Sequence, residues 1–265
     1  MSATLFKRSL RSAAAVMAAI VVVLAFYIAM VAYLYDPEVS ESIQLMQAAM
    51  PELFEAFGMA NPSATLLDFL LNYLYGFLFT GTLVLMAAYL AQRLVVGPVR
   101  DGSLAWLLAA PRSRLSLALT FVAVEVAAVA IVVGLSWGAE VIACEALFPG
   151  ELDGAALAQA NAGLVALGLF VAALCFASAC CFQHTGLALW GGAGACAVFL
   201  LMGTAGAVGK GLAWVADLSP LALYDAYGLA AADGGAVAGA VVLGVVAAAL
   251  FALGVARFCR RDFSL

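Results

Sequence analysis

The stretch SLALTFVAVEVAAVAIVVGLSWGA, residues 116 to 139, contains a single charged side chain, Glu125. An α-helix rises 1.5 Å per residue, so these residues would form a helix about 36 Å long. The hydrocarbon core of a bilayer is about 30 Å thick. The stretch therefore predicts a helix that crosses a membrane.

Five further apolar segments of similar length accompany this one. Of the 265 residues, 67% are hydrophobic and only 10% are charged, with a mean hydropathy of +1.13, whereas soluble domains carry about 25% charged residues. This composition excludes a soluble enzyme, a disordered chain and a disulfide scaffold. It predicts one all-α polytopic membrane domain covering residues 1–265. The expected helices lie at about 12–35, 68–91, 116–139, 156–182, 187–207 and 235–256.

The positive charges lie in three clusters, which contain ten of the eleven Lys and Arg residues. The clusters precede the first apolar segment, separate the second from the third, and follow the last. Because cytoplasmic loops retain Lys and Arg, we expect both termini and the 92–115 loop to be cytoplasmic and the acidic loops to be external. Glu140 and Glu145 belong to one of those acidic loops in this interpretation. An even number of spans agrees with two termini on one side.

Two other segments predict short helices outside the spans. In the first, Leu5, Phe6 and Leu10 alternate with basic residues, which is typical of an amphipathic helix lying along the cytoplasmic interface. In the second, residues 206–234, apolar and polar side chains alternate irregularly. That segment is too polar to span and too apolar for a free loop, so short helices at the outer face are expected.

Catalytic and metal-binding signatures are absent from the sequence. It has no phosphate-binding loop, no H-E-x-x-H, no G-x-S-x-G and only one histidine, His184. The six cysteines form no C-x-x-C pair and are interpreted as small packing residues. The chain is therefore expected to be a non-enzymatic protein without a metal or cofactor of its own.

Glu125 is the unusual acid, because it falls in the middle of a predicted span. A charge there costs at least about 2.5 kcal/mol, so the side chain should face the interior of the bundle or a wet cavity. Two hypotheses fit this position: a substrate or proton site, and a neutral carboxyl buried for packing.

The loop from Gly97 to Arg114 reads GPVRDGSLAWLLAAPRSR. Asp101 or Ser103 can cap a helix, and Pro111 would end it, which predicts a two-turn cytoplasmic helix. Ser113 can then cap the third membrane helix. An apolar stripe at i, i+3 and i+4 is formed by Leu104, Leu107 and Leu108.

This loop resembles the cytoplasmic loop of ABC-2 type permeases, which typically read D-G-[TS]-L and then L-L-x-x-P-x-[ST]-R before the third helix. The amphipathic N-terminus, the Leu218–Leu221 stretch and the closing Arg260–Phe263 stretch are also similar to that family. Departures occur at Pro98 and Arg100, where acidic residues are common. The matching residues in the loop are Asp101, Gly102, Ser103, Leu104, Leu107, Leu108, Pro111, Ser113 and Arg114.

The resemblance implies the membrane subunit of an ABC exporter in the cytoplasmic membrane. Such a subunit pairs with a second permease, identical or different, and with separate ATP-binding subunits that carry ATP and Mg²⁺. The Asp101–Pro111 helix would be the coupling helix that contacts the ATPase, with Arg114 at its end. Lipids are the expected surroundings, and no nucleic acid is expected as a partner. The cargo is not identified, although the apolar helices suit lipidic, peptidic or drug-like molecules.

Two other functions remain open at this stage. One is a secondary transporter or ion-conducting protein organised around Glu125. The other is a purely structural membrane subunit. A neighbouring gene encoding an ATPase with a phosphate loop would favour the exporter over both.

The charge distribution makes a topological prediction. In a cysteine-free background, cysteines introduced near Glu52 and Ala230 should react with an impermeant reagent on intact cells, whereas one at Arg112 should be protected. Protection of both external sites would contradict the six-helix arrangement.

Overall fold

The computed structural model describes residues 2–35, 45–46, 48–51, 65–104, 106, 113–182, 184–208 and 213–261. Every regular element in these ranges is helical. Six helical stretches are long and apolar enough to cross a membrane, which confirms the predicted all-α, multi-pass architecture. They are Ala3–Leu34, Phe77–Arg100, Arg114–Leu147, Gly154–Cys181, Thr185–Gly206 and Gly234–Arg260.

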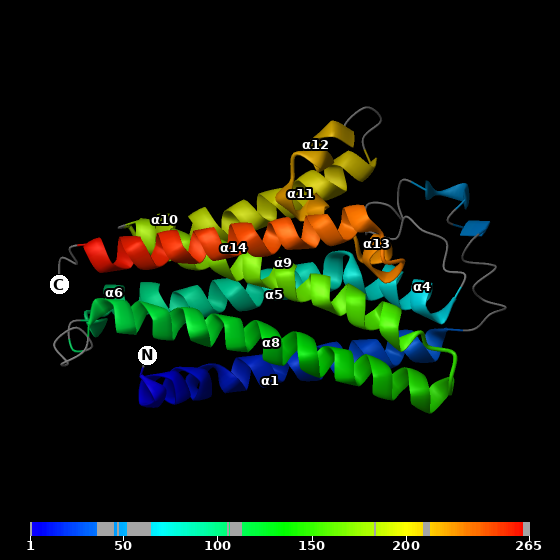
Figure 1. The fold of residues 1–265 in the computed structure, drawn as a ribbon, viewed down its shortest axis with the longest axis horizontal. Coiled ribbons are helices and arrows are strands. Elements are labelled where there is room, and N and C mark those ends of the chain that lie inside the picture. Colours follow the sequence, from blue (N-terminus) through cyan, green and yellow to red (C-terminus); the bar gives the residue numbers. More distant parts are fainter. Residues whose placement is uncertain are drawn as a thin grey trace.

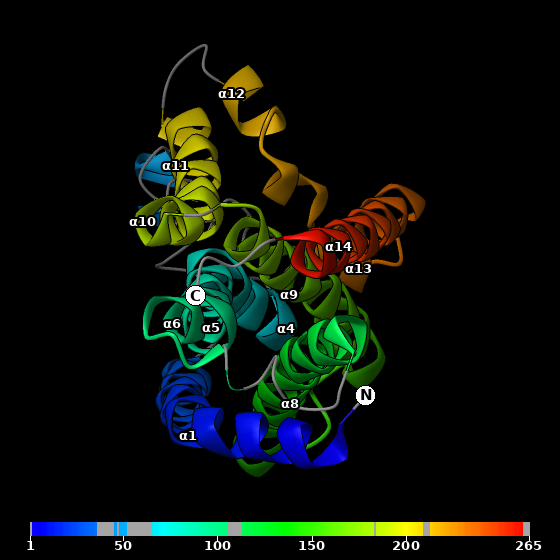
Figure 2. The same ribbon diagram turned by 90° about the vertical axis from the view of Figure 1, so that its left-hand side faces the viewer.

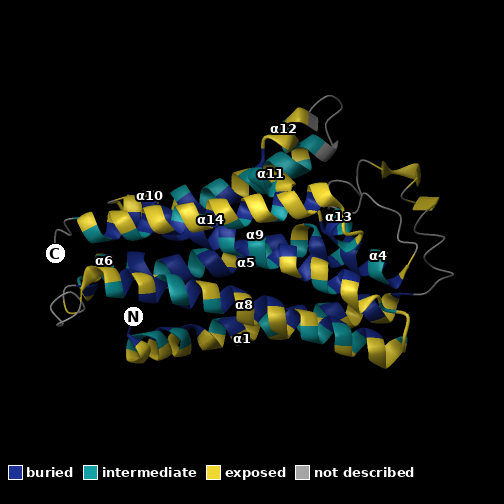
Figure 3. Cartoon of the chain, viewed as in Figure 1, coloured by how far each residue is buried: buried dark blue, intermediate teal, exposed yellow. Residues whose placement is uncertain are grey.

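Five of these stretches make the body of the bundle (Figure 1). Helix α9 (Gly154–Cys181) packs against α14 (Gly234–Arg260), α5 (Phe77–Ala91) and α8 (Arg114–Leu147), and α1 (Ala3–Leu34) packs mainly on α8. Helix α9 is dominated by buried positions, whereas α1 and α14 expose apolar side chains along their outer faces (Figure 3). In a bilayer those outer faces contact lipid or another membrane protein.

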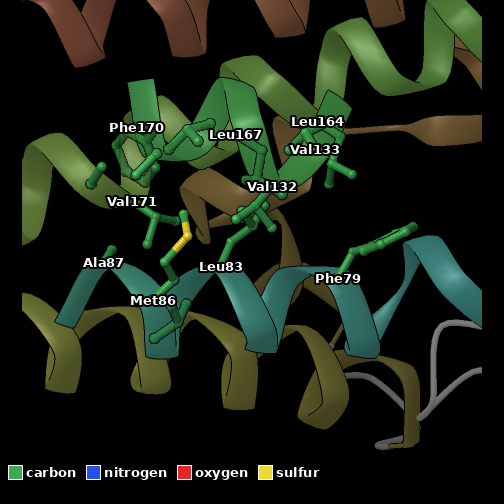
Figure 4. Close-up of a cluster of buried hydrophobic side chains, with 14 of the residues drawn as sticks. Phe79, Leu83, Met86, Ala87, Val132, Val133, Leu164, Leu167, Phe170 and Val171 are labelled. Atoms are coloured by element: carbon green, nitrogen blue, oxygen red, sulfur yellow. The ribbon is translucent and has the colours of Figure 1, made fainter. Parts of the chain in front are cut away.

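The interior of the bundle is filled by aliphatic and aromatic side chains of three helices (Figure 4). Leu83 and Met86 of α5 lie opposite Val132 of α8 and Leu167 of α9, and all four are buried. Close packing of this kind holds membrane helices together, because lipid removes the hydrophobic drive for helix association.

The second span is broken, whereas the sequence predicted a continuous helix at about 68–91. It begins with α4 (Leu66–Leu70) and the π-helical η1 (Leu71–Tyr75), is interrupted at Gly76, and resumes as α5. At the break, the buried Thr80 hydroxyl donates a hydrogen bond of 2.9 Å to the Gly76 carbonyl one turn earlier, so this polar side chain has a partner inside the protein. The span then continues through the π-helical η2 (Gln92–Val96) to α6 (Gly97–Arg100).

Helix α8 is longer than predicted. It has 34 residues, or about 51 Å at the α-helical rise, and it continues eight residues past the expected end at 139. Ser113 caps it as predicted, accepting a hydrogen bond from the Ser116 N–H at 3.2 Å. The extra length places Glu140 inside the helix with no exposed surface, so its assignment to an external acidic loop was wrong.

The fifth span packs on α9 through its first half, where the Ser178 hydroxyl donates to the Ala188 carbonyl at 2.9 Å, and its second half leads toward the short helix Ala213–Asp217 (Figure 2). It comprises α10 (Thr185–Leu189), the π-helical η3 (Trp190–Gly194) and α11 (Ala195–Val208). After it come three short helices: α12 (Ala213–Asp217), the 3-10 helix η4 (Pro220–Leu223) and α13 (Ala226–Ala230). Their position at the outer face of a membrane stays a prediction.

The N-terminal amphipathic stretch is not a separate helix. Residues from Leu5 to Arg11 belong to α1, which is uninterrupted from Ala3 to Leu34 and is capped by Ser2. The first turns of α1 run across the end of the bundle (Figure 2). Whether they lie along a membrane surface stays a prediction.

The start of α1, the end of α14, α6 and the start of α8 lie at one end of the bundle (Figure 1). The Ser2 N–H donates to the Thr120 hydroxyl at 3.1 Å, and the Arg114 side chain donates to the Arg261 carbonyl at 2.9 Å. These bonds tie both ends of the chain to the first turns of α8. The predicted even number of crossings is consistent with this arrangement.

Close backbone contact between α14 and η4 yields a stability prediction. A Cβ at Gly239 would overlap the carbonyl oxygen of Leu223, whereas a Cβ at Gly244, on the same helix, has open space around it. Gly239→Ala should therefore destabilise the fold by about 1–3 kcal/mol, as overpacking does. Gly244→Ala should be neutral or slightly stabilising. The melting temperature of each detergent-solubilised variant is measured by heating the protein and determining the monodisperse fraction by size-exclusion chromatography. Equal melting temperatures for the two variants would contradict the close packing of α14 on η4.

Candidate functional site

The loop predicted to contact an ATPase is described up to Leu104 and at Trp106. Gly102 has a φ of +70°, a left-handed conformation that glycine adopts without strain, and it turns the chain after α6. Asp101 does not cap a following helix in the described part of the loop. Its carboxylate pairs with the Arg100 guanidinium at 3.0 Å on the surface.

One position of the predicted leucine stripe differs from expectation. The side chain of Leu104 is fully buried against this chain's own core, so it does not face outward to a partner. The large exposed side chain at this point is Trp106, with 83% of its surface accessible. The other predicted coupling residues, Leu107, Leu108 and Pro111, lie outside the described residues.

Arg114 has a structural role that the sequence did not indicate. Its guanidinium donates to the carbonyls of Cys259 and Arg261 at 3.5 and 2.9 Å, at the C-terminus of α14. Arg261 in turn donates to the carbonyls of Ala179 and Cys180 at the end of α9, at 3.3 and 3.2 Å. Cationic side chains stabilise helix C-termini by satisfying the last carbonyls and the helix dipole. The two arginines therefore fasten α8, α14 and α9 together next to the loop.

A cavity of about 630 Å³ lies beside the loop, between the start of α1, the η2–α6 segment and α8. Its lining includes the side chains of Arg8, Arg93 and Arg100, together with Trp106. Asp101, which pairs with Arg100, also lines the cavity, so three cations and one anion leave this end of the bundle with an excess of positive charge. The loop region is therefore basic, and it carries the exposed aromatic side chain of Trp106.

Glu125 is fully buried within α8, which confirms that it faces the interior. Neither carboxylate oxygen has a hydrogen-bond partner within the described part of the chain. It lies close enough to Cys175 and Cys180 of α9 for electrostatic interaction. It lines neither of the two cavities described here.

A second buried carboxylate has a well-defined set of partners. Glu140 of α8 accepts a hydrogen bond from the Tyr75 hydroxyl at 2.8 Å and another from the Asn161 amide of α9 at 3.0 Å, both at Oε2. The Asn161 amide also donates to the Tyr75 hydroxyl and to the Leu157 carbonyl. Tyr75, Glu140 and Asn161 are exposed by only 2, 0 and 5%. We call these three residues the tyrosine–carboxylate cluster.

The cluster adjoins a largely apolar cavity of about 290 Å³. Tyr75 and Gly76 form part of its wall where the second span is broken, and Thr80 lies one turn further along α5. The opposite wall comes from α11 and from η4 with Tyr224. The lining residues are Tyr75, Gly76, Phe77, Thr80, Phe199, Leu200, Gly203, Thr204, Ala216, Ser219, Leu221, Ala222 and Tyr224.

Two tyrosines between the fifth and sixth spans bind backbone carbonyls. The Tyr224 hydroxyl donates to the Ala160 carbonyl at 3.4 Å, and the Tyr227 hydroxyl donates to the Asp68 carbonyl at 3.0 Å. Burial raises the pKa of Tyr224 well above its ordinary value, and the nearby Glu140 raises it further. Burial and then the Asp68 carboxylate raise the pKa of Tyr227. Both hydroxyls therefore remain protonated donors at physiological pH.

The sequence contained one signal for the tyrosine–carboxylate cluster. Asn161 lies inside the expected span at 156–182, and polar side chains within spans commonly mark a functional or packing site. The apolar stretch seemed to end at 139, so Glu140 was assigned to a loop and the connection to Asn161 was missed.

Comparisons with known proteins return no match: no family model, no curated protein and no solved structure is significantly similar to this chain.

The environment of Glu125 leads to a prediction. Glutamine keeps the size and hydrogen-bonding capacity of the side chain and removes its charge, and Glu125 borders neither cavity. Glu125→Gln should therefore accumulate in membranes like the wild type and, if the chain works with an ATPase as the resemblance implies, leave the ATP hydrolysis of that complex close to the wild-type rate. Normal accumulation with lost activity would instead favour a proton or cargo role for Glu125.

Proposed function

We propose that this chain is the membrane permease subunit of an ABC-2 type exporter. The observation that carries the proposal is the Gly97–Arg114 sequence, which resembles the coupling loop of that family and occurs between the second and third of six spans. The exposed Trp106 supports it, because exposed tryptophans commonly act as anchors in protein interfaces. A partner ATPase would supply ATP and Mg²⁺, since the sequence contains no phosphate-binding loop.

In this proposal helix α8 transmits the motion. It starts directly after the loop, at Arg114, and continues without a break to Leu147, passing Glu125 and Glu140. A rigid helix displaced at its first turn also moves at its far end. Closure of the ATPase subunits would therefore displace Glu140 of α8 and its partner Asn161 of α9 relative to Tyr75 of the broken second span. Two such bundles would alternate between inward and outward access.

The arginine contacts make α8 part of a larger moving unit. Arg114 joins α8 to the end of α14, and Arg261 joins that end to α9. Force applied at the loop would reach three spans at once. The broken second span, interrupted at Gly76, is the element that can change shape most easily beside them.

A secondary transporter or ion-conducting protein is the second candidate. The observation that favours it is Glu125, a fully buried carboxyl without a hydrogen-bond partner among the described residues. Ionisable groups of this kind mark ion or proton paths in many transporters. Activity that persists without any ATPase would favour it over the exporter.

Substitutions in the loop test the exporter proposal. Trp106→Ala removes an exposed side chain, and Leu108→Asp would place a charge in an apolar cleft of the partner, at a cost of several kcal/mol of association. Both variants should insert normally but lose the ATPase subunit during purification. Arg112→Ala should retain it, because exposed charges contribute little.

Leu104→Ala provides an internal comparison. Leu104 is buried in the chain itself, so its truncation should lower the free energy of unfolding by about 2–5 kcal/mol. The protein that still folds should copurify with the ATPase subunit in the same ratio of ATPase to permease as the wild type. Retention of the ATPase by both Trp106→Ala and Leu108→Asp at the wild-type ratio would contradict the coupling role of the loop.

A further inference from the structure

The hydrogen-bonding capacity of the tyrosine–carboxylate cluster is unbalanced. Its donors are the Tyr75 hydroxyl and the Asn161 amide, and both are directed to acceptors inside the protein. Two acceptor atoms, Glu140 Oε1 and Asn161 Oδ1, are buried with no donor among the described residues. A surplus of acceptors in a buried place is complementary to a hydrogen-bond donor or a cation.

No cation of the described chain neutralises Glu140. The one ion pair that the described residues form, between Arg100 and Asp101, belongs to the loop at the other end of α8. The cavity lining likewise contains no Lys, Arg or His. A buried carboxylate without a counter-charge is costly, and a cationic ligand beside it would relieve that cost.

Tyr75 connects the carboxylate to the cavity. Its hydroxyl group donates to Glu140 and accepts from Asn161, and its side chain forms part of the cavity wall. A phenolic oxygen has two lone pairs, so one remains for a ligand. Donation to a carboxylate polarises the hydroxyl and makes its oxygen a stronger acceptor. A donor that reaches the Tyr75 oxygen from the cavity would therefore be hydrogen-bonded to the cluster.

The rest of the cavity suits an apolar body. Phe77, Phe199, Leu200 and Leu221 contribute hydrophobic surface, and Tyr224 adds an aromatic ring. Aromatic faces also attract cations. The volume of about 290 Å³ is at the lower end of the range for small-molecule sites.

We propose that this cavity binds amphiphilic amines, with the ammonium group at Tyr75 and the apolar body between α5, α11 and η4. This inference deepens the proposed function by naming a class of cargo, and it rests on that function only for the step of transport. Binding itself requires the chain and its cavity, with or without an ATPase.

The test uses three probes that carry different head groups on the same phenylbutyl body: 4-phenylbutylammonium, 4-phenylbutanol and 5-phenylpentanoate. Binding of the tritiated amine to the full-length chain in nanodiscs is measured by scintillation proximity, and the other two probes are used as competitors. The amine should bind at least about tenfold more tightly than the alcohol, since hydrogen bonds to charged groups are stronger than neutral ones. The carboxylate should not compete.

Matched variants locate the site. Glu140→Gln removes the charge but keeps the shape, and it should weaken amine binding by about ten- to a hundredfold while the affinity for the alcohol changes little. Tyr75→Phe should weaken both probes, because the contact atom is lost. Glu125→Gln is the control: it makes the same change at another fully buried carboxyl of α8, and amine binding should stay at the wild-type level.

Gly203→Leu tests independently whether the amine binds in this cavity, and it can be used if Glu140→Gln fails to accumulate. Gly203 lines the cavity, and a Cβ at this position has no heavy atom of another residue within 4 Å, so the first carbon of a leucine side chain has room there. It should abolish binding of both the amine and the alcohol. Wild-type binding in Gly203→Leu, or equal affinity of the wild-type protein for amine and alcohol, would overturn the proposal.

The two proposals fail in different experiments. If no ATPase accompanies the chain but the amine binds as described, the exporter assignment is wrong and the binding site stands. If an ATPase is retained and the amine binds no better than the alcohol, the exporter assignment stands and the cargo class is wrong.

Discussion

The absence of water from the bilayer core is the constraint on which the rest of this structure depends. Each backbone group there needs a partner within the protein, and each buried polar side chain needs one too. The chain meets the first requirement with long helices, among which α8 and α9 pack side by side through the bundle. Beside the break at Gly76, the Thr80 hydroxyl has the Gly76 carbonyl as its acceptor. The ends of α9 and α14 are satisfied by Arg261 and Arg114.

The same constraint makes the two buried carboxylates of α8 informative. Glu140 has a tyrosine and an asparagine as donors, lies behind the wall of a cavity, and retains one oxygen without a donor among the described residues. Glu125 has no such donors and borders neither cavity. Their different surroundings give them different roles in our proposals: in the exporter, Glu140 supports a binding site and Glu125 is interior packing, whereas the alternative transporter would depend on Glu125. Both are on the helix that starts at the basic loop, which connects that loop mechanically with the cavity.

The sequence predicted much of this fold, because membrane spans are determined by length and apolarity alone. The six spans, the Ser113 cap and the interior position of Glu125 could all be predicted from single segments. The errors arose where tertiary contacts decide the outcome. Glu140 looked like a loop residue because the apolar stretch ended beside it, and only packing against Tyr75 and Asn161 explains its burial. Leu104 looked like an outward stripe residue, yet the core of the chain covers it. The cavity could not be predicted at all, since three separate segments form its walls.

Native mass spectrometry of the wild-type complex, released from membranes in nanodiscs, tests the central claim that this chain is the permease of an ATP-driven exporter. Our account predicts an assembly of two permease chains, identical or different, with two copies of an ATPase that contains a phosphate loop. A chain that occurs only by itself or with copies of itself, and never with an ATPase, would contradict the account.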